Sequence, residues 1–321
     1  MAKTIQEREQ AGAGTAVTRV NSRRRFSITP YLFILPHLIF FAIFVGYPFV
    51  SGLVYSTFQY NFLTPENNTF VGLGNYANLF NPQSREFDLF WNALGNTVIF
   101  MLWSVPSLVI IPLLLAVLLN TKLPGRNIYR AIIFAPWVLS VSVISLLWYW
   151  IFQSNGGLVN SYAKALGIFG TDGPPRWLST LPAAWVAITI ATVWWTMGFN
   201  MIILLAALQD IPEQLYEAAT IDGANTWQKF WRITLPLLQA VLVFVITITI
   251  IASFNLFGQP LFMTNNGPSR GTEPVMFRIY DEGFSRNAQG SAAAMSFVVA
   301  LIMIVISYLN FRLFRQRDTN Y

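Results

Sequence analysis

The chain alternates between long stretches without charge and short segments that carry all of its charged residues. Each uncharged stretch exceeds the roughly 20 apolar residues that a helix needs to cross a bilayer core. The stretches are too long and too uniformly apolar for barrel strands, which alternate with a period of two. The pattern therefore predicts an all-α membrane protein with six transmembrane helices. We place these helices near residues 31–58, 92–119, 131–153, 182–208, 237–259 and 289–311.

Composition supports the membrane assignment and excludes several kinds of site. Hydrophobic residues make up 55% of the chain and charged residues only 11%, whereas soluble domains carry about 25% charged residues. A soluble protein of this size with so many apolar residues would expose large hydrophobic patches. The absence of cysteine excludes disulfides, thiol nucleophiles and cysteine-ligated metals. His37 is the only histidine, so a histidine-rich metal site is excluded as well.

The basic residues predict which side of the membrane each segment faces. The N-terminal tail, the loops at 120–130 and 209–236 and the C-terminal tail hold fourteen of the 20 basic residues, and the loops between them hold six. Because lysine and arginine accumulate on the cytoplasmic side, the first group should be cytoplasmic, together with both termini. This distribution explains the net charge of +6 better than nucleic-acid binding does.

The N-terminal region divides into a tail and the start of the membrane domain. Residues 1–25 are polar and are expected to form a disordered cytoplasmic tail, and the membrane domain covers 26–321. The apolar segment after the tail is too long for a cleavable signal peptide. We expect this first span to remain as a helix, bent at Pro36 or Pro48.

The charged segment between the fourth and fifth spans has the composition of a structured loop. It reads DIPEQLYEAATIDGANTWQKFWRITLP over residues 210–236. Asp210 is predicted to cap a helix, with Glu213 completing a capping box and Pro212 in the first turn. Gly223 should end this helix in the left-handed conformation. A second short helix is predicted from Thr226 to Trp231, after which Leu235 and Pro236 turn the chain back toward the bilayer. On this chemistry alone, the first helix fits either a groove on another protein or the membrane interface.

Seven positions of this segment match a fixed pattern: Glu-Ala-Ala, three residues, Gly, nine residues, Ile, one residue, Leu-Pro. The pattern resembles the EAA loop of bacterial ABC importer permeases. It is met by Glu217, Ala218, Ala219, Gly223, Ile233, Leu235 and Pro236. Tyr216 and the run Ile221–Ala224 resemble the carbohydrate-uptake subfamily in particular. Residues 70–80, 127–140 and 262–268 are also similar to segments of the permease related to the larger one of the maltose transporter.

The resemblance implies a type I ABC importer permease fold with a cytoplasmic coupling helix, in a bacterial inner membrane. It implies one chain of a heterodimeric pore, with a sister permease, two ATPase subunits or an ATPase homodimer, and an extracytoplasmic solute-binding protein as partners. The chain would then be no enzyme and hold no cofactor, since ATP and magnesium would be bound by the ATPase. Glu217 would anchor the coupling helix, Ala218 and Ala219 would permit close approach, Gly223 would make the turn and Pro236 would begin the next span. Asp222, Ile233 and Leu235 complete the coupling set.

The predicted spans contain no Asp, Glu, Lys or Arg. That argues against a carrier coupled to protons or sodium, which buries ionisable groups to couple the ion, and it suits a neutral substrate. Sugars require amides, hydroxyls and aromatic rings. The candidate substrate residues are Trp194, Trp195, Asn200, Thr249, Ser253, Asn255 and Gln259. The last four divide over two helix faces, so only one pair is expected to line a pore, and any of these residues could instead join helices together.

Three alternatives remain open from the sequence. A secondary carrier or channel would leave the EAA loop unexplained. A membrane-embedded enzyme would lack any cluster of His, Asp or Glu at membrane depth. Gly72 and Gly74 are expected to form a loop turn. No lysine followed by serine or threonine comes after them, so the sequence does not predict a nucleotide-binding phosphate loop. A permease for a glycerol-phosphate-type solute is the closest alternative, because backbone amides can hold phosphate.

Overall fold

The computed structural model describes residues 29–121, 123–167 and 175–315. It divides into two compact units, Met1–Val50 and Ser51–Tyr321, which are described separately. The predicted tail at residues 1–25 lies outside the described residues. In the first unit, α2 (Thr29–Phe41) passes Pro36 and continues as a π-helical segment over Ala42–Gly46 into α3 (Tyr47–Tyr55). Pro48 lacks an N–H, so the turn before it loses a helical hydrogen bond, and this accounts for the local change of winding.

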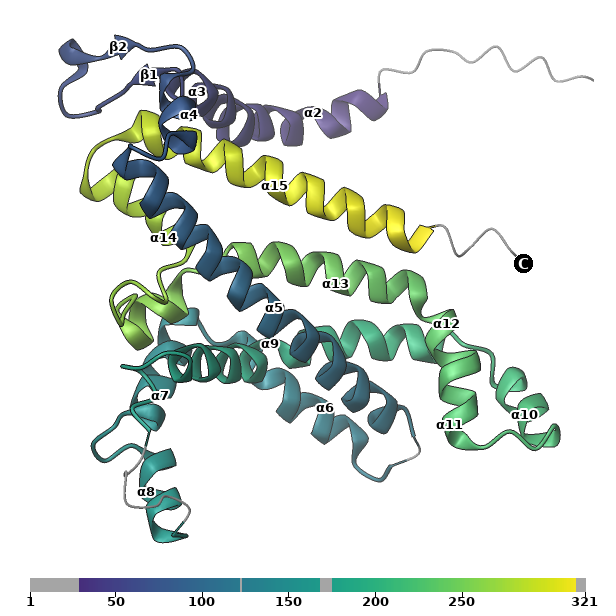
Figure 1. Cartoon of the computed structure of the whole chain (residues 1–321). Helices are drawn as coiled ribbons and strands as arrows, with labels where there is room; N and C mark the ends of the chain where they lie inside the picture. Colours follow the sequence, from purple (N-terminus) through teal and green to yellow (C-terminus); the bar gives the residue numbers. More distant parts are fainter. Residues whose placement is uncertain (1–28, 122, 168–174, 316–321) are drawn as a thin grey trace, which may run out of the picture. The chain divides into compact units, whose positions relative to one another are not determined.

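The second unit is a set of helices with one small hairpin (Figure 1). Its strands β1 (Phe58–Gln59) and β2 (Thr69–Phe70) pair antiparallel, with Phe58 opposite Phe70. The helices are α4 (Gly74–Phe80), α5 (Arg85–Asn120), α6 (Arg126–Phe134), α7 (Val141–Phe152), α8 (Leu158–Ala165), α9 (Ala183–Gln209), α10 (Glu213–Ile221), α11 (Thr226–Lys229), α12 (Leu235–Leu237), α13 (Gln239–Phe254), α14 (Val275–Tyr280) and α15 (Gln289–Arg315). The 3-10 turns are Pro65–Asn67 and Ala135–Val138, and the π-helical segments are Phe230–Thr234, Pro260–Thr264 and Asp281–Ser285.

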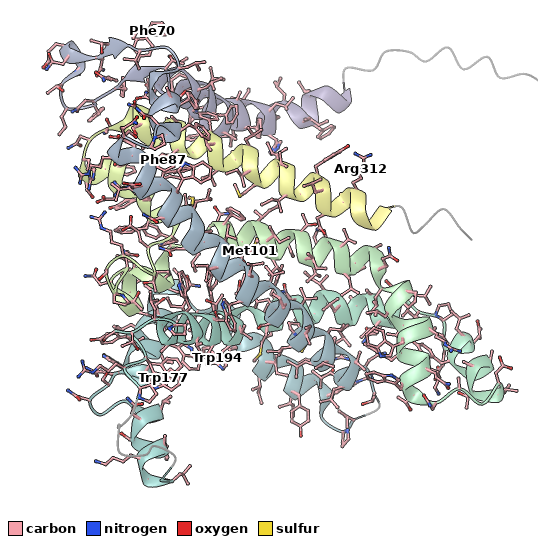
Figure 2. All side chains as sticks on the ribbon, in the orientation of Figure 1. Phe70, Phe87, Met101, Trp177, Trp194 and Arg312 are labelled. Atoms are coloured by element: carbon pink, nitrogen blue, oxygen red, sulfur yellow. The ribbon has the colours of Figure 1, made fainter. Side chains whose placement is uncertain are left out.

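Among the residues that the structure describes, four helices have the length and apolar composition of membrane spans, and two bent helix pairs raise the number to six if each pair counts as one span. The second predicted span begins earlier than expected, because α5 starts at Arg85. Ser84 caps this helix by accepting a 3.1 Å hydrogen bond from the amide of Phe87. Glu86 and Asp88 lie in the first turn, where acidic groups interact favourably with the helix dipole. Figure 2 shows α5 running from the region of Phe87 past Met101.

The helices of the third and fifth predicted spans are each broken by a bend. Residues 126–138 and 141–152 form two arms bent by 100°, with Pro136 in the 3-10 turn between the α-helices. The fifth region bends by 69° where α12 meets α13, and α13 ends at Phe254 rather than at residue 259. Residues 255–257 are not helical, and the chain becomes helical again at Gly258 before the π-helical segment Pro260–Thr264.

Helices α5, α9 and α13 form the centre of the second unit. One buried cluster joins them near the C-terminal ends of α5 and α9, through residues that include Leu119, Leu204 and Val245. A second cluster packs the start of α5 against α14 and α15, and a third joins α5, α7 and α9. The central helices are therefore fixed by apolar packing on both sides of the region in which their polar residues lie.

Candidate functional site

A cavity of about 410 Å³ lies among α5, α9, α13 and the bend between α6 and α7. No charged side chain is among the described residues that line it. Its walls are apolar and aromatic, with a few hydroxyl and amide groups, which is the usual composition of a small-molecule site. The lining residues are Phe100, Leu108, Trp137, Val141, Thr192, Trp195, Thr196, Phe199, Asn200, Ile248, Thr249, Ala252, Ser253, Asn255, Leu256, Phe257, Gly258 and Gln259.

Six of the seven substrate residues predicted from the sequence line this cavity; Trp194 does not. The ring of Trp194 lies edge-on against Trp148, with the centroids 5.7 Å apart, and Figure 2 marks its place on α9. Thr249 and Ser253, and Asn255 and Gln259, were placed on two different helix faces, yet both pairs lie at this cavity. The chain leaves the helical path after Phe254, so Gln259 no longer follows the helix face that its spacing suggested.

Three of the polar residues also join helices to one another. The amide of Asn200 donates to the carbonyl of Leu108 at 2.8 Å and to the hydroxyl of Thr249 at 3.4 Å. The hydroxyl groups of Ser104 and Ser253 lie 3.2 Å apart. These bonds satisfy polar groups that would be costly to bury alone. They fix the position of the hydroxyls at the cavity wall.

Asn255 and Gln259 have hydrogen-bonding capacity to spare. The amide of Asn255 donates to the carbonyl of Ile251 at 2.8 Å, and its side chain is exposed. Gln259 is 5% exposed and makes no side-chain hydrogen bond with any residue that the structure describes. Because a buried amide normally has a partner, Gln259 is placed to bind a polar group inside the cavity.

The aromatic wall of the cavity includes residues that sequence reasoning missed. The Trp137 ring stacks on Phe199 at 4.8 Å and lies 5.6 Å from Trp195. The indole of Trp195 donates to the carbonyl of Leu139 at 3.1 Å. The spacing of Thr192, Trp195, Thr196 and Phe199 along one helix face was a usable signal for the α9 side. Trp137 carried no such signal, because it reaches the cavity through the bend.

Gly198 allows that bend to approach α9. A β-carbon at this position would lie 2.4 Å from the carbonyl oxygen of Ile133 and 2.6 Å from the α-carbon of Phe134. Only glycine can sit this close to the backbone of another helix. The close contact between α6 and α9 brings Trp137 within reach of Phe199 and Trp195.

The predicted coupling segment forms a helical hairpin at the C-terminal end of α9 (Figure 1). Gly223 ends α10 with a φ of +79°, as the sequence predicted. The amide of Ala224 bonds the carbonyl of Ala219 at 2.9 Å, and the amide of Gly223 bonds that of Thr220 at 3.1 Å, which together form a Schellman cap. Asn225 then opens α11 through a capping box with Gln228.

The predicted start of this hairpin was wrong in detail. Asp210 ends α9 instead of capping the next helix, and no capping box with Glu213 forms. The extended residue Pro212 takes the N-cap position, and α10 begins at Glu213. Proline fixes its own φ and disfavours helix in the residue before it, so the chain must leave α9 before the new helix starts.

The hairpin is fixed to the bundle on one face and exposed on the other. Leu235, with Ile211 and Phe230, packs against the cluster at the ends of α5 and α9. The hydroxyls of Tyr216 and Thr234 lie 2.9 Å apart and tie the two arms together. Exposed residues of the coupling set include Glu217, Ala218, Asp222, Gly223 and Pro236; Ala219 and Ile233 are half-buried. Ile221 is 87% exposed, which is unusual for a large apolar side chain in a polar segment.

Glu217 and Glu213 share α10 and are both exposed. Neither forms an ion pair within the part of the chain that the structure describes. An exposed acidic and apolar helix surface is able to receive a complementary partner.

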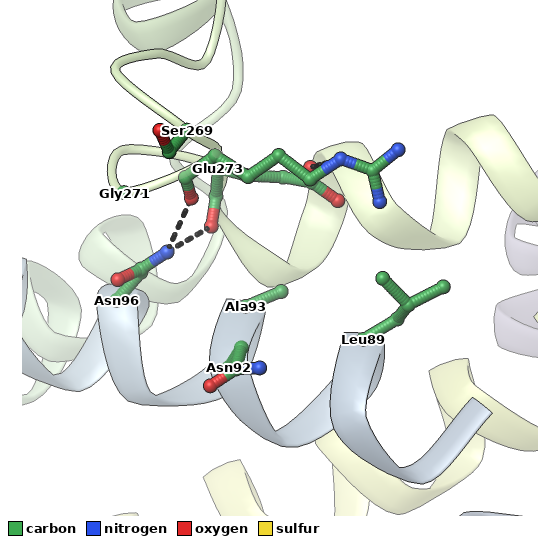
Figure 3. Close-up of a pocket in the computed structure, with 8 residues that line it drawn as sticks. Leu89, Asn92, Ala93, Asn96, Ser269, Gly271 and Glu273 are labelled. Carbon is green, nitrogen blue, oxygen red and sulfur yellow. Dashed lines mark hydrogen bonds and ion pairs between the residues drawn. The ribbon is translucent and has the colours of Figure 1, made fainter. Parts of the chain in front are cut away.

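A second cavity, of about 300 Å³, lies between the start of α5 and the loop before α14 (Figure 3). The amide of Asn96 donates to the backbone carbonyls of Arg270 and Glu273, at 3.0 Å and 3.1 Å. The next residue, Thr97, accepts a 2.9 Å bond from the amide of Val275. Helix α5 thus holds this loop at two adjacent positions.

Comparisons with known proteins agree with this arrangement. Residues 85–318 match the family model described as the binding-protein-dependent transport system inner membrane component. The chain is 36% identical over 287 residues to the arabinooligosaccharides transport system permease protein AraP of Bacillus subtilis, with 88% of each chain covered. It is 35% identical to the lactose transport system permease protein LacF of Rhizobium radiobacter, covering 94% of this chain and 98% of that one. A chain of a bacterial alginate ABC transporter in complex with an alginate pentasaccharide-bound periplasmic protein has the same fold, with a TM-score of 0.76, 22% identity and coverage of 91% and 95%.

Proposed function

Because the chain belongs to the family of binding-protein-dependent transport system inner membrane components, we propose that it is a permease subunit of an ATP-driven importer for a sugar or oligosaccharide. The observation that carries the substrate class is the uncharged cavity lined by aromatic rings, hydroxyls and amides. Such a lining suits a neutral, hydroxylated ligand, whose ring faces pack on aromatic groups and whose hydroxyls bond to amides. The relatives named for arabinooligosaccharide and lactose transport support this class.

The hairpin at 210–236 is proposed to face the cytoplasm and to bind an ATPase subunit, as the distribution of basic residues suggests. Both termini would lie on the same side. Glu217 would form a charge-assisted hydrogen bond with the ATPase, and Ile221 would be buried on docking. ATP and magnesium would be bound by that partner and not by this chain.

Movement at the hairpin has a direct route to the cavity. The π-helical segment Phe230–Thr234 continues through α12 into α13, which carries Thr249 and Ser253. A displacement of the docked hairpin would therefore shift one wall of the cavity against α9. Alternating access requires two such arrangements, with the cavity open to one side at a time. A sister permease is proposed to complete the pore.

An external solute-binding protein is proposed as the donor of substrate. The family is defined by such dependence, and the structural neighbour was solved with a periplasmic protein that holds an alginate pentasaccharide. Alginate is described there as acidic, whereas the cavity of this chain has no basic residue among those that line it. A neutral sugar is therefore the expected cargo.

The first experiment purifies the tagged chain in mild detergent and identifies the proteins that accompany it. We expect a second permease and an ATPase, and we expect Glu217→Lys to lose the ATPase by charge reversal at the docking surface. The matched control is Glu213→Lys on the same helix, which should retain the ATPase. A chain that purifies alone and moves solute in liposomes without ATP would sink the assignment in favour of a secondary carrier.

The substrate class is tested with the complete complex in proteoliposomes. Lactose, maltose, trehalose and arabinotriose form the test panel, and glycerol 3-phosphate represents the alternative solute class. ATP-dependent uptake of one of the sugars supports the proposal. Uptake of glycerol 3-phosphate alone would replace it, because that result requires a phosphate site in the backbone of a pore without basic side chains.

A further inference from the structure

Four aromatic rings form a continuous row from the cavity to the surface of the segment between α13 and α15. Phe257, which lines the cavity, has its ring centroid 5.4 Å from that of Tyr280 and 5.9 Å from that of Phe277. Tyr280 in turn stacks on Phe284 at 5.1 Å. Exposure increases along the row: Phe257 and Phe277 are half-buried, Tyr280 is 46% exposed and Phe284 is 74% exposed. We name these four residues the aromatic row.

The same helical run directs its charged side chains inward. Arg278 is fully buried, and its guanidinium lies 2.9 Å from the carboxylate of Asp281 and 2.5 Å from that of Glu282. Glu273 approaches it at 3.7 Å, and Arg286 bonds Asp281 at 3.2 Å. An ordinary surface helix has the reverse arrangement, with apolar groups inside and charges outside.

This inverted arrangement has a cost and a consequence. Buried ion pairs lose hydration that their attraction only partly repays, and exposed rings lose the stabilisation that burial would give. The consequence is that the rings of the aromatic row keep a fixed position, because the ion pairs hold the buried side of α14. Figure 1 shows α14 beside the first turns of α5 and α15, and α5 holds the preceding loop through Asn96 and Thr97.

The position of the row favours a sugar over lipid as its occupant. The row lies on a segment outside the candidate membrane spans, with charged residues between and beside its outer rings. The side chains of Asp281 and Arg286, close to Tyr280 and Phe284 in sequence, stay partly exposed at 23% and 27%, and charges are costly next to lipid chains. The row is also continuous with the cavity through Phe257, which lines it together with the amide-bearing Asn255 and Gln259.

We propose that the aromatic row is a binding track for the C–H faces of sugar rings, along which substrate passes between the outer surface and the cavity. This inference rests on the proposed function. Aromatic rings attract such faces through their negative π-surface without fixing the orientation of the hydroxyls. The track therefore provides affinity at each step and leaves hydrogen-bond selection to the cavity.

The test uses the complete complex in proteoliposomes, with saturating sugar-loaded binding protein and the panel sugar that the native complex carries fastest. Phe284→Leu and Tyr280→Leu remove a ring from exposed positions. We expect sugar uptake to fall about threefold to tenfold, the loss of one aromatic contact, while stimulated ATP hydrolysis stays unchanged. More ATP is then hydrolysed per sugar carried. Phe284→Tyr should restore the native ratio, and Phe62→Leu, an exposed ring elsewhere (69% exposed), should leave it unchanged.

A second measurement reads the track directly. The chain has no cysteine, so Ser285→Cys places a single thiol beside Phe284 and leaves all four rings intact. A charged maleimide should label this thiol, and the transported sugar should slow the labelling several-fold. A thiol that reacts equally fast with and without sugar, together with unchanged uptake in Phe284→Leu, would overturn the proposal.

Other outcomes also decide the matter. Loss of the sister permease from Phe284→Leu would assign the row to a subunit interface, and the track would be abandoned. Failure of the charged maleimide to reach the thiol in the isolated chain would assign it to lipid. If the native complex carried no panel sugar at all, the proposed function itself would fail. If the native complex carried sugar and the ring variants carried it equally well, only the binding track would fail.

Discussion

The hairpin at 210–236 connects α9 with α13, and the segment 264–286 connects α13 with α15. The hairpin exposes its acidic side chains, whereas the second segment buries its central charged side chains. In the hairpin, Glu213 and Glu217 are exposed and the apolar Leu235 packs inward. In the second segment, Arg278 is fully buried and Phe284 is exposed. Local hydrogen bonds end α10 and begin α11 in the hairpin, whereas α5 holds the second segment through Asn96 and Thr97. The difference leaves the hairpin with acidic groups free for a partner, whereas the second segment pairs its charges within itself.

The largest expected effect is the loss of the buried arginine. Arg278→Met leaves Glu273, Asp281 and Glu282 without the cation at their centre, and breaking a buried ion pair from one side costs about 3–5 kcal/mol. We expect a marked fall in the unfolding temperature of the detergent-solubilised chain. Arg232→Met removes an exposed arginine from the hairpin and should change it little. Equal effects of the two substitutions would contradict the comparison.

A smaller and local effect is expected at Gly223. Its φ of +79° is unfavourable for other residues, and Gly223→Ala should cost about 1–2 kcal/mol although no atom lies within 4 Å of the added carbon. Hydrogen exchange of the amides at the end of α10 should accelerate about fivefold to thirtyfold. Gly223→Asn should show less change, since asparagine tolerates this conformation. Exchange of the amides of α14 should stay at the native rate in both variants, and acceleration there would show that the two segments are not independent.

The same contrast explains how much could be predicted from the sequence. The end of α10 was predictable, because Gly223 and its neighbours determine it through local bonds. Its start was not, because the cap expected at Asp210 was displaced by the backbone restriction at Pro212. The composition of the spans predicted polar candidates for a cavity and Trp195, but not Trp137 and Phe199 of its aromatic wall. Trp137 reaches that wall only through a 100° bend that a charge-free run of sequence conceals.

The ion-pair cluster was missed for a related reason. The sequence assigns charged residues outside the spans to loops that set membrane orientation, and nothing in their spacing distinguishes an exposed arginine from a buried one. Arg278 is buried because α5, far away in sequence, and the following helix α15 pack around its helix. Burial of this kind follows from the tertiary arrangement, so periodicity within one short helix does not reveal it.

The smallest expected effect is a pH dependence that belongs to the second segment alone. Burial raises the pKa of Asp281, but the charge of Arg278 and hydrogen bonds from Arg286 and Ser285 outweigh it, and the pKa lies below the ordinary 3.8. Asp281 therefore contributes stability that is present above that value and is lost as the pH falls through the lower folded pKa. The unfolding temperature of the native chain should exceed that of Asp281→Asn at pH 6, and the two should converge on acidification.

Glu273 contributes to the pH dependence with the opposite sign. Burial raises its pKa from 4.5 despite its arginine neighbours. The stability that it contributes is therefore present below 4.5 and is lost as the pH rises through the higher folded pKa. Glu273→Gln should thus steepen the net loss of stability toward acid, and an unchanged profile in both variants would show that the cluster is hydrated instead of buried.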